Sequence, residues 1–217
     1  MSPHATPAAL LVAATALLGG CVETKGLDYS ALRAHKPRSI LVLPPLNEST
    51  DVSGTYGFLS TVTAPIAEQG YYVFPVAVVD QYLKENGLPT AGEMHQVPLA
   101  KLREIIGADA VLYLDLVQYG SKYHLISSDT IVSAKGRLVD ARSGDVLWEG
   151  ATVAQQNSNG NGSGNLLADA LAALITQAIN SKTDQGHRVS VLASQQLFLT
   201  PGRGLPYGPH HPKYGTD

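Results

Sequence analysis

Short apolar runs along the chain alternate with segments in which apolar residues recur at helical spacing. Residues 39–43 read Ser-Ile-Leu-Val-Leu and are closed by two prolines, a pattern typical of a buried strand. Residues 56–69 instead place apolar side chains four positions apart, which predicts a helix. Gly70 follows as a helix-ending residue, and Pro65 is expected to kink this helix or to mark its restart. The folded part of the chain is therefore expected to begin with a strand and a helix.

The same patterns predict the remaining elements. Runs rich in Val, Leu and Tyr indicate strands at residues 71–74, 110–119, 130–140 and 146–154. Helical spacing indicates helices at residues 76–85, 98–106 and 166–179. Two segments are less regular. Residues 123–126 are expected to continue the preceding strand after a turn at Gly120 and Ser121, and residues 189–199 to form a last strand or an irregular arm.

The predicted order of elements is β-α-β-α-α-β-β-β-α. Early strands and helices alternate, whereas the later strands follow one another as a meander. This order predicts an α/β (α+β) fold, in which a mixed sheet with packed helices forms a three-layer or two-layer sandwich. We assign residues 38–199 to a single globular α/β domain. Residues 200–217 are rich in proline and glycine and are expected to form a tail without regular structure.

The N-terminal residues have the features of a secretion signal. Residues 8–18 are apolar but too few to cross a bilayer, which takes about 20 residues, and their number fits the apolar region of a signal peptide. The following Leu-Gly-Gly-Cys, which ends at Cys21, resembles the lipobox of bacterial lipoproteins. In that family the cysteine thiol receives a diacylglycerol, and the signal peptide is cut just before it. Residues 1–20 are therefore predicted to be a lipoprotein signal peptide and Cys21 the lipid-attachment site.

Two simpler interpretations of this segment stay open: a plain signal peptide, or a buried N-terminal helix in which Cys21 is incidental. On the lipoprotein interpretation, residues 21–37 are the lipidated cysteine and a short tether. This tether reaches about 50 Å when fully extended, so the domain is expected close to its membrane. Val22 stands where an aspartate commonly signals retention in the inner membrane. The resemblance thus implies an outer-membrane lipoprotein facing the periplasm, with exposure at the cell surface as the alternative.

Composition and charge narrow the classes of function. Charged residues make up 15% of the chain, the formal net charge is −3, and the 15 Lys and Arg residues form no basic run. No basic field is therefore available to attract nucleic acid, and we exclude a nucleic-acid partner. Cys21 is the only cysteine in the sequence, so no intramolecular disulfide forms.

No catalytic or metal-binding constellation with a specific spacing stands out. Asp109 and Asp115 could form a carboxylate pair, but their positions around an apolar run are more typical of strand-end and turn groups. The alternating glycines of residues 160–164 precede a predicted helix but lack the lysine of a phosphate-binding loop. His210 and His211 are adjacent in a proline-rich segment without a third ligand nearby. We therefore predict no enzyme activity, no cofactor and no metal site.

Three segments together resemble a known group of envelope proteins. Residues 40–49 (ILVLPPLNES) look like its opening strand and loop, residues 107–113 (GADAVLY) like its helix-to-strand junction, and residues 139–148 (VDARSGDVLW) like its hairpin. The group includes the curli-secretion lipoprotein, the N-terminal domain of the Tol-system periplasmic protein and the lipoprotein activators of peptidoglycan synthases. Over residues 18–215, including LPYGPHHPKY at 205–214, the chain resembles a family of surface-antigen-type bacterial lipoproteins of unknown function.

This resemblance implies a fold and a compartment, and it brings no catalytic residues. The function it favours is a membrane-anchored binding or structural component of an envelope secretion or assembly system. Such a component would contact other envelope proteins and form a homo-oligomer. The alternative is a small-ligand or glycan binder, or a hydrolase, with a pocket near residues 47–56 or 157–165. A deep polar cleft would favour the alternative, whereas a broad apolar patch or a symmetric contact would favour the binding component.

Overall fold

The structure is a computed structural model, and it describes residues 26–123, 128–157 and 185–216. The predicted signal peptide, Cys21, the glycine-rich loop from residue 158 onward and the predicted helix at residues 166–179 lie outside the described residues.

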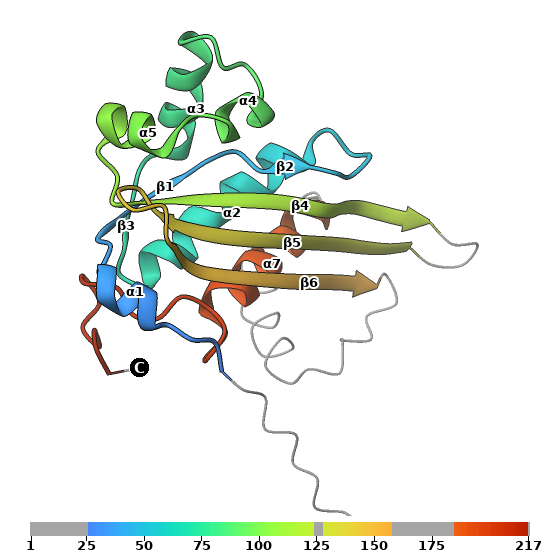
Figure 1. The fold of residues 1–217 in the computed structure, drawn as a ribbon. Helices are drawn as coiled ribbons and strands as arrows, with labels where there is room; N and C mark the ends of the chain where they lie inside the picture. The colour runs from blue at the N-terminus through green and yellow to red at the C-terminus, as the bar shows by residue number, and fades with distance from the viewer. Residues whose placement is uncertain (1–25, 124–127, 158–184, 217) are drawn as a thin grey trace, which may run out of the picture.

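A mixed six-stranded sheet forms the centre of the fold, with the strand order β3-β1-β4-β5-β6 and with β2 also paired to β4 (Figure 1). The strands are β1 (Ser39–Val42), β2 (Leu46–Asn47), β3 (Tyr72–Val73), β4 (Ala110–Tyr123), β5 (Ser128–Asp140) and β6 (Val146–Asn157). Strand β1 runs parallel to both β3 and β4, whereas β4, β5 and β6 pair antiparallel. The prediction of a mixed sheet is confirmed.

Strand β4 is longer and more continuous than the sequence pattern indicates. The predicted turn at Gly120 and Ser121 is wrong, because both residues pair with β5, Gly120 with Ile131 and Ser121 with Thr130. The strand absorbs an irregularity between Leu116 and Gln118 instead. Gly120 has a φ of 114°, a conformation that glycine adopts within a strand at little steric cost. The glycine therefore adjusts the path of the strand and does not end it.

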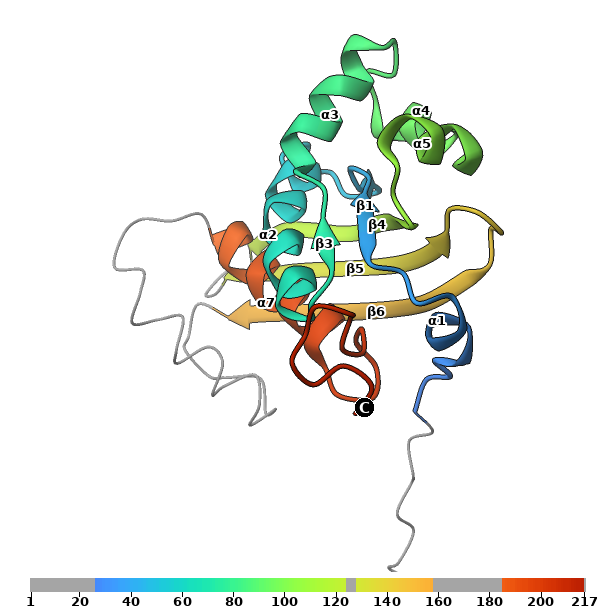
Figure 2. The same cartoon turned by 90° about the vertical axis from the view of Figure 1, so that its left-hand side faces the viewer.

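Helices cover the two faces of the sheet unequally. The helices are α1 (Ser30–His35), α2 (Gly54–Glu68), α3 (Val76–Glu85), α4 (Ala91–His95), α5 (Leu99–Ile106) and α7 (Gln185–Leu199). Helices α2 and α7 pack on one face along the long strands, and α3, α4 and α5 lie on the other (Figures 1 and 2). Two apolar cores result. Phe58, Leu138 and Phe198 belong to the core under α2 and α7, and Met94 and Leu102 to the smaller core under α3–α5.

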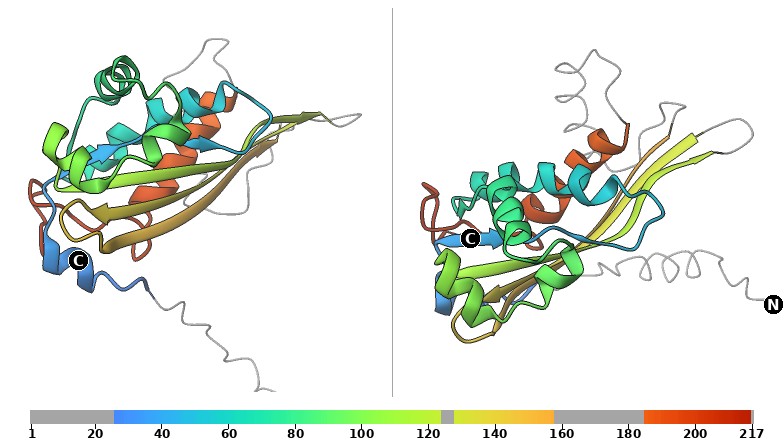
Figure 3. Two further views of the ribbon diagram at one scale, coloured as in Figure 1. Left: turned by 45° about the horizontal axis from the view of Figure 1, so that its top comes forward. Right: turned by 90° about the horizontal axis from the view of Figure 1, so that it is seen from above.

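The smaller helical layer ends part-way along the sheet. Figure 3 shows β4, β5 and β6 extending well beyond α3–α5. On this uncovered face the side chains of Lys135, Arg137 and Glu149 are exposed, whereas the alternate positions, such as Val132 and Leu138, are buried in the core under α2 and α7. The sandwich therefore has three layers at one end and two layers over the rest of the sheet.

Helix α7 corrects the prediction for residues 189–199, which are neither a strand nor an irregular arm. Its buried positions Val189, Ala193 and Leu197 recur every four residues, so they form one helix face against the sheet. Ser190 and Ser194 are also fully buried on this helix. Valine favours a strand and serine favours caps and turns, and burial against the sheet and α2 overrides these local preferences.

Serine side chains of α7 complete the hydrogen bonding of α2. Pro65 lies inside α2 and lacks the N–H that would bond the carbonyl of Thr61. The Ser194 hydroxyl donates to that carbonyl at 3.1 Å, and the Thr61 hydroxyl lies 3.3 Å from the carbonyl of Ser190. Helix α2 therefore continues through Pro65 without the restart considered from the sequence, because a neighbouring helix satisfies the freed carbonyl.

Helix α1 lies within the segment predicted to be a tether. Leu32 is buried in the main core, the Tyr29 hydroxyl donates to the carbonyl of Gly204 at 2.8 Å, and the backbone N–H of Leu27 donates to the carbonyl of Gly202 at 3.2 Å. Apolar and aromatic side chains thus fix the chain to the domain from Leu27 onward. Residues 27–37 of the predicted tether therefore belong to the folded domain.

Helix α4 was missed in the sequence, although its start carries a recognisable signal. Thr90 and Glu93 form a capping box, in which the Thr90 hydroxyl accepts from the Glu93 N–H at 3.3 Å and the Glu93 carboxylate accepts from the Thr90 N–H at 3.0 Å. The other helices of this layer match the predictions, with α3 over the predicted residues and Pro98 directly before α5.

Residues 200–216 contain no helix or strand, yet they pack closely on the domain. The N–H of Gly208 donates to the carbonyl of Gln69 at 2.6 Å, and the N–H of His210 donates to the carbonyl of Gly70 at 3.0 Å. Trp148 donates from its indole N–H to the carbonyl of Arg203 at 2.9 Å. Backbone hydrogen bonds to the end of α2 therefore hold this C-terminal segment against the domain, although it forms no helix or strand.

Gly70 and Gly87 provide a matched pair for testing how tightly the C-terminal segment is packed. Both have a positive φ, 84° and 85°, which costs an alanine about 1–2 kcal/mol. A Cβ at Gly70 would also collide with the backbone of His211, whereas a Cβ at Gly87 would meet open space. We expect Gly70→Ala to lower the free energy of unfolding by about 1–3 kcal/mol more than Gly87→Ala, measured by denaturant titration. Equal losses would contradict the close packing.

Candidate functional site

The uncovered face of the sheet is hollowed next to α4 and α5. The depression has a volume of about 940 Å³ and is open to solvent; we call it the sheet hollow. It is lined by Leu46, His95, Leu99, Tyr113, Asp115, Lys135, Gly136, Arg137, Val139, Gly144, Val146, Glu149, Gly150 and Ala151. Its floor comes from β4, β5 and β6, and its wall from α4 and α5.

Charges of opposite sign alternate across the floor of the sheet hollow. Asp115 lies opposite Lys135 in the β4–β5 register, and Arg137 lies opposite Glu149 in the β5–β6 register. The Arg137 guanidinium also sits over the Tyr113 ring, 5.5 Å from its centroid, a favourable cation–π arrangement. The floor therefore presents mixed charge, and neither sign predominates.

His95 fixes the wall of the hollow and is uncharged at neutral pH. Its Nε2 atom lies 2.8 Å from the carbonyl of Pro44 and donates a hydrogen bond to it. The ring meets Tyr113 edge-on, with centroids 5.3 Å apart. Burial lowers the pKa of His95, although the bond to Pro44 opposes this shift. Burial likewise raises the pKa of Tyr113. Both rings therefore offer neutral, orienting groups beside the charged floor.

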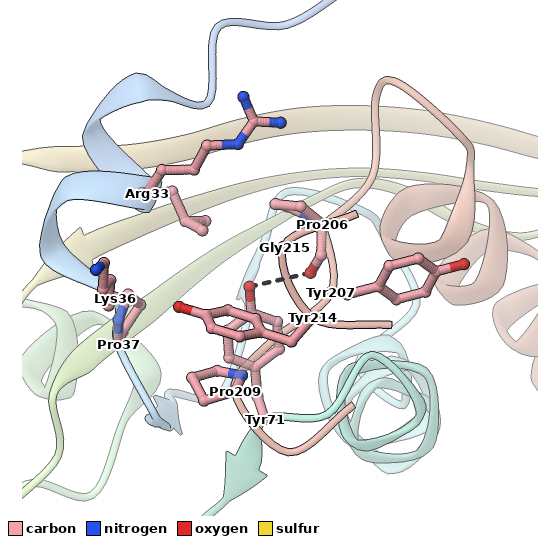
Figure 4. A pocket seen from close by; sticks show the side chains of 10 residues that line it. Arg33, Lys36, Pro37, Tyr71, Pro206, Tyr207, Pro209, Tyr214 and Gly215 are labelled. Carbon is pink, nitrogen blue, oxygen red and sulfur yellow. Dashed lines mark hydrogen bonds between the residues drawn. The ribbon is translucent and has the colours of Figure 1, made fainter. Parts of the chain in front are cut away.

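A second depression lies between α1 and the C-terminal segment, with a volume of about 450 Å³. We call it the aromatic groove; it is lined by Leu32, Arg33, Lys36, Pro37, Tyr71, Pro206, Tyr207, Pro209, Tyr214 and Gly215 (Figure 4). Arg33 and Lys36 come from the α1 side, and Tyr214 and Pro209 from the C-terminal side. Two cations therefore border a cavity whose other walls are mainly aromatic and proline side chains.

Hydrogen bonds and stacking hold the walls of the aromatic groove in place. The buried Tyr71 hydroxyl donates to the carbonyl of Pro206 at 3.0 Å (Figure 4). Tyr207 and His211 stack face to face, with ring centroids 3.9 Å apart, and the Nδ1 atom of His211 accepts from the backbone N–H of Lys213 at 3.0 Å. The walls of the groove are therefore held by contacts within the protein itself.

An acid–base cluster joins α1 to the turn between β5 and β6. The two ring nitrogens of His35 each lie 3.2 Å from a carboxylate, Nδ1 from Asp140 and Nε2 from Asp145. Burial alone would raise the pKa of Asp140, but the backbone N–H groups of Ser143 and Arg142 and the His35 ring together hold it below its usual value.

The candidate residues chosen from the sequence do not come together as a site. The carboxylate of Asp109 accepts from the backbone N–H groups of Arg38 and Ser39 at 3.0 and 3.2 Å, so it fixes the start of β1, whereas Asp115 lies on the floor of the sheet hollow. Within the described residues, no group of three or more His, Cys, Asp or Glu side chains could hold a metal ion.

The alternative function requires a polar pocket near residues 47–56 or 157–165, and residues 158–165 lie outside the described residues. In the loop at residues 47–56, the polar side chains are largely engaged in hydrogen bonds within the loop. Asn47, Ser49 and Asp51 bond mainly to one another, for example from the Asn47 amide to the carbonyl of Asp51 at 2.8 Å. The polar depression lies instead on the sheet face, where only Leu46 contributes from this part of the chain. Neither depression was found from sequence, since each is assembled from residues far apart in the chain. Helices long and apolar enough for a membrane span are absent from the part of the chain that the structure describes.

Comparison with known proteins gives consistent results. Residues 27–210 match the family described as "Putative lipoprotein GNA1162-like". The chain is 46% identical over 194 residues to "Putative lipoprotein NMB1124/NMB1162" of Neisseria meningitidis serogroup B. The aligned region covers 88% of this chain and 90% of that protein. The crystal structure of lipoprotein GNA1162 from Neisseria meningitidis is 49% identical, with a TM-score of 0.56, and covers 67% of this chain and 100% of that chain.

A PelC dodecamer from Paraburkholderia phytofirmans is also similar, over 73% of this chain and 89% of that chain. At 13% identity and a TM-score of 0.42, this likeness is too low to support a conclusion about assembly.

The charge on Asp140 is expected to make the stability of the domain depend on pH. The pKa of Asp140 is lowered in the folded state. Its carboxylate therefore stabilises the folded protein at pH values above the unfolded pKa of about 3.9, and this stabilisation is lost as the pH falls through the folded pKa. We expect Asp140→Asn to lower the free energy of unfolding by about 1 kcal/mol at pH 7, with the difference vanishing in acid. Urea titrations at several pH values measure this, with the exposed Glu104→Gln on α5 as a nearly neutral control. A difference independent of pH would refute it.

Proposed function

The chain belongs to the GNA1162-like family of lipoproteins, and on this premise we propose that it is an envelope lipoprotein that binds partner proteins and catalyses no reaction. The anchor is the lipid on Cys21, and the membrane is the outer membrane, with the domain facing the periplasm. The domain serves as a component of an envelope secretion or assembly system, and it associates with further copies of itself. Its fold relation to the curli-secretion lipoprotein and the Tol-system protein stays a prediction.

The uncovered sheet face is the observation that carries this proposal. Antiparallel strands can leave one face of a sheet to solvent, and the antiparallel strands β4–β6 leave one face open beyond α3–α5. Exposed apolar side chains lie on β6 beside the charged floor: Val153 is 66% exposed and Val146 is 44% exposed. Apolar positions bordered by polar and charged groups are typical of protein interfaces. The face is therefore suited to a protein partner that completes the missing layer.

The second candidate function is binding of a glycan or another small ligand. It is favoured by the convergence of Tyr113, Asp115, Lys135 and Arg137 on the sheet hollow. Small-ligand sites usually enclose most of the ligand surface, whereas the sheet hollow is wide and open to solvent. The shape therefore favours a protein partner over a small molecule.

Photo-crosslinking at two matched valines tests the proposed interface. Val153 lies on β6 and is 66% exposed, and Val78 lies on α3 and is 64% exposed. We expect a photoreactive amino acid at position 153, in cells, to form discrete adducts with an envelope protein or a second copy of the chain. The same probe at position 78 should form none, and Arg137→Glu should reduce the adducts at position 153.

Two outcomes would count against the protein-binding proposal. Equal adducts from both positions would mean that crosslinking reports exposure alone. Adducts at position 153 that contain cell-wall glycan and no protein would favour the second candidate function.

A further inference from the structure

The chain meets its membrane next to the aromatic groove. Leu27 lies six positions after Cys21, and this stretch spans at most about 20 Å even when fully extended. Leu27 is bonded to Gly202 of the C-terminal segment. Gly202 lines a small cavity that shares Arg33, Pro206 and Tyr207 with the aromatic groove. A lipid on Cys21 would therefore hold this end of the domain at the headgroup layer of the bilayer.

The segments around the groove carry a net positive charge, opposite in sign to the net charge of the whole chain. The complete sequence has a formal net charge of −3. Residues 28–38 and 200–217, by contrast, contain five cations against two acidic residues, Asp28 and Asp217. The cations are Arg33, Lys36, Arg38, Arg203 and Lys213. Cations at a membrane surface are attracted by anionic phospholipids, so this end of the domain is complementary in charge to such a surface.

The side chains that line the groove suit the headgroup layer. Arg33 and Lys36 are its charged lining residues, and no carboxylate lines it. Guanidinium and ammonium groups bind phosphate oxygens. Tyr71, Tyr207 and Tyr214 add aromatic rings with polar hydroxyls, and tyrosine is enriched where a protein meets the membrane–water interface. In Figure 4 the cations and Tyr214 lie on opposite sides of the groove.

We propose that the aromatic groove binds the phosphate-bearing headgroup of an anionic phospholipid in the membrane that holds Cys21. The lipid anchor brings the groove to the surface, and Arg33 and Lys36 contact the headgroup phosphate. This second contact fixes the orientation of the domain, so that the end carrying α1 and the C-terminal segment faces the bilayer. The inference rests on the proposed lipid anchor and is independent of the partner interface on the sheet face.

The test uses the acylated protein in vesicles with a fluorophore on one introduced cysteine. Cys21 is the only cysteine of the sequence, and acylation blocks its thiol, so a single new cysteine is labelled uniquely. Thr216→Cys places the label next to Gly215 of the groove, and Glu85→Cys places it at the end of α3. Vesicles of phosphatidylcholine, with or without phosphatidylglycerol, carry a headgroup nitroxide that quenches nearby fluorophores.

We expect phosphatidylglycerol to increase quenching of the label at position 216 and to leave the label at position 85 unchanged. The double variant Arg33→Glu, Lys36→Glu should lose the increase, down to the quenching seen in phosphatidylcholine alone. The charge-matched control Lys101→Glu, Arg103→Glu, on the exposed side of α5, should keep it. Arg33→Gln, Lys36→Gln should lose it in part, and unchanged circular dichroism and Trp148 emission verify folding.

Three results would overturn the inference. Quenching of the Arg33→Glu, Lys36→Glu protein as strong as in the unsubstituted protein would remove the role of the cations. Equal quenching of both labels would show a domain without fixed orientation. Abolition of the quenching by inorganic phosphate at constant ionic strength would mean that the groove takes free phosphate. A chain that is not acylated is recognised beforehand by its intact mass, so failure of the anchor and failure of the groove are distinguishable.

Discussion

The contact between α2 and α7 is the interaction on which the rest of the structure depends. Pro65 leaves the carbonyl of Thr61 without its helical partner, and the Ser194 hydroxyl supplies the missing hydrogen bond at 3.1 Å. Leaving that carbonyl buried and unpaired would cost about 1–3 kcal/mol. The two helices pack closely here because the contact residues of α7 are small, Ser190, Ala193 and Ser194.

The pair formed by α2 and α7 covers one face of the sheet and positions the ends of both helices. The end of α2 then bonds Gly208, and the end of α7 bonds Leu205, so the C-terminal wall of the aromatic groove follows from this contact.

The unequal covering of the two sheet faces separates the two candidate surfaces. On the side of α3–α5, the helical layer protects only β1 and the beginning of β4, and the remaining strands carry the sheet hollow. The aromatic groove lies elsewhere, between α1 and the C-terminal segment, beside the point where the chain leaves toward Cys21. A domain held at the membrane through the groove keeps a second surface for a partner. The two proposals are therefore compatible in one molecule.

The predictable part of the fold is the part encoded in local patterns. The apolar run of β1, the spacing in α2 and the alternation along β5 each match the elements found, because burial of one face imposes a period on the sequence. Helix α7 escaped prediction because its buried face contains serines and valines, whose helical placement depends on α2 and the sheet. The aromatic groove could not be predicted, since the bond between Tyr71 and Pro206 joins positions 135 residues apart. For α4, the Thr-x-x-Glu capping box was present in the sequence and would have located the helix.

Both proposals depend most directly on the lipid at Cys21, since the anchor sets the compartment and brings the aromatic groove to the membrane. The decisive measurement is the intact mass of the protein purified from its own membranes. We expect a chain that begins at Cys21 and carries the added mass of a diacylglycerol and an amide-linked acyl chain. A chain that retains residues 1–20, or an unmodified Cys21, would contradict this expectation and leave an α/β domain without its proposed anchor.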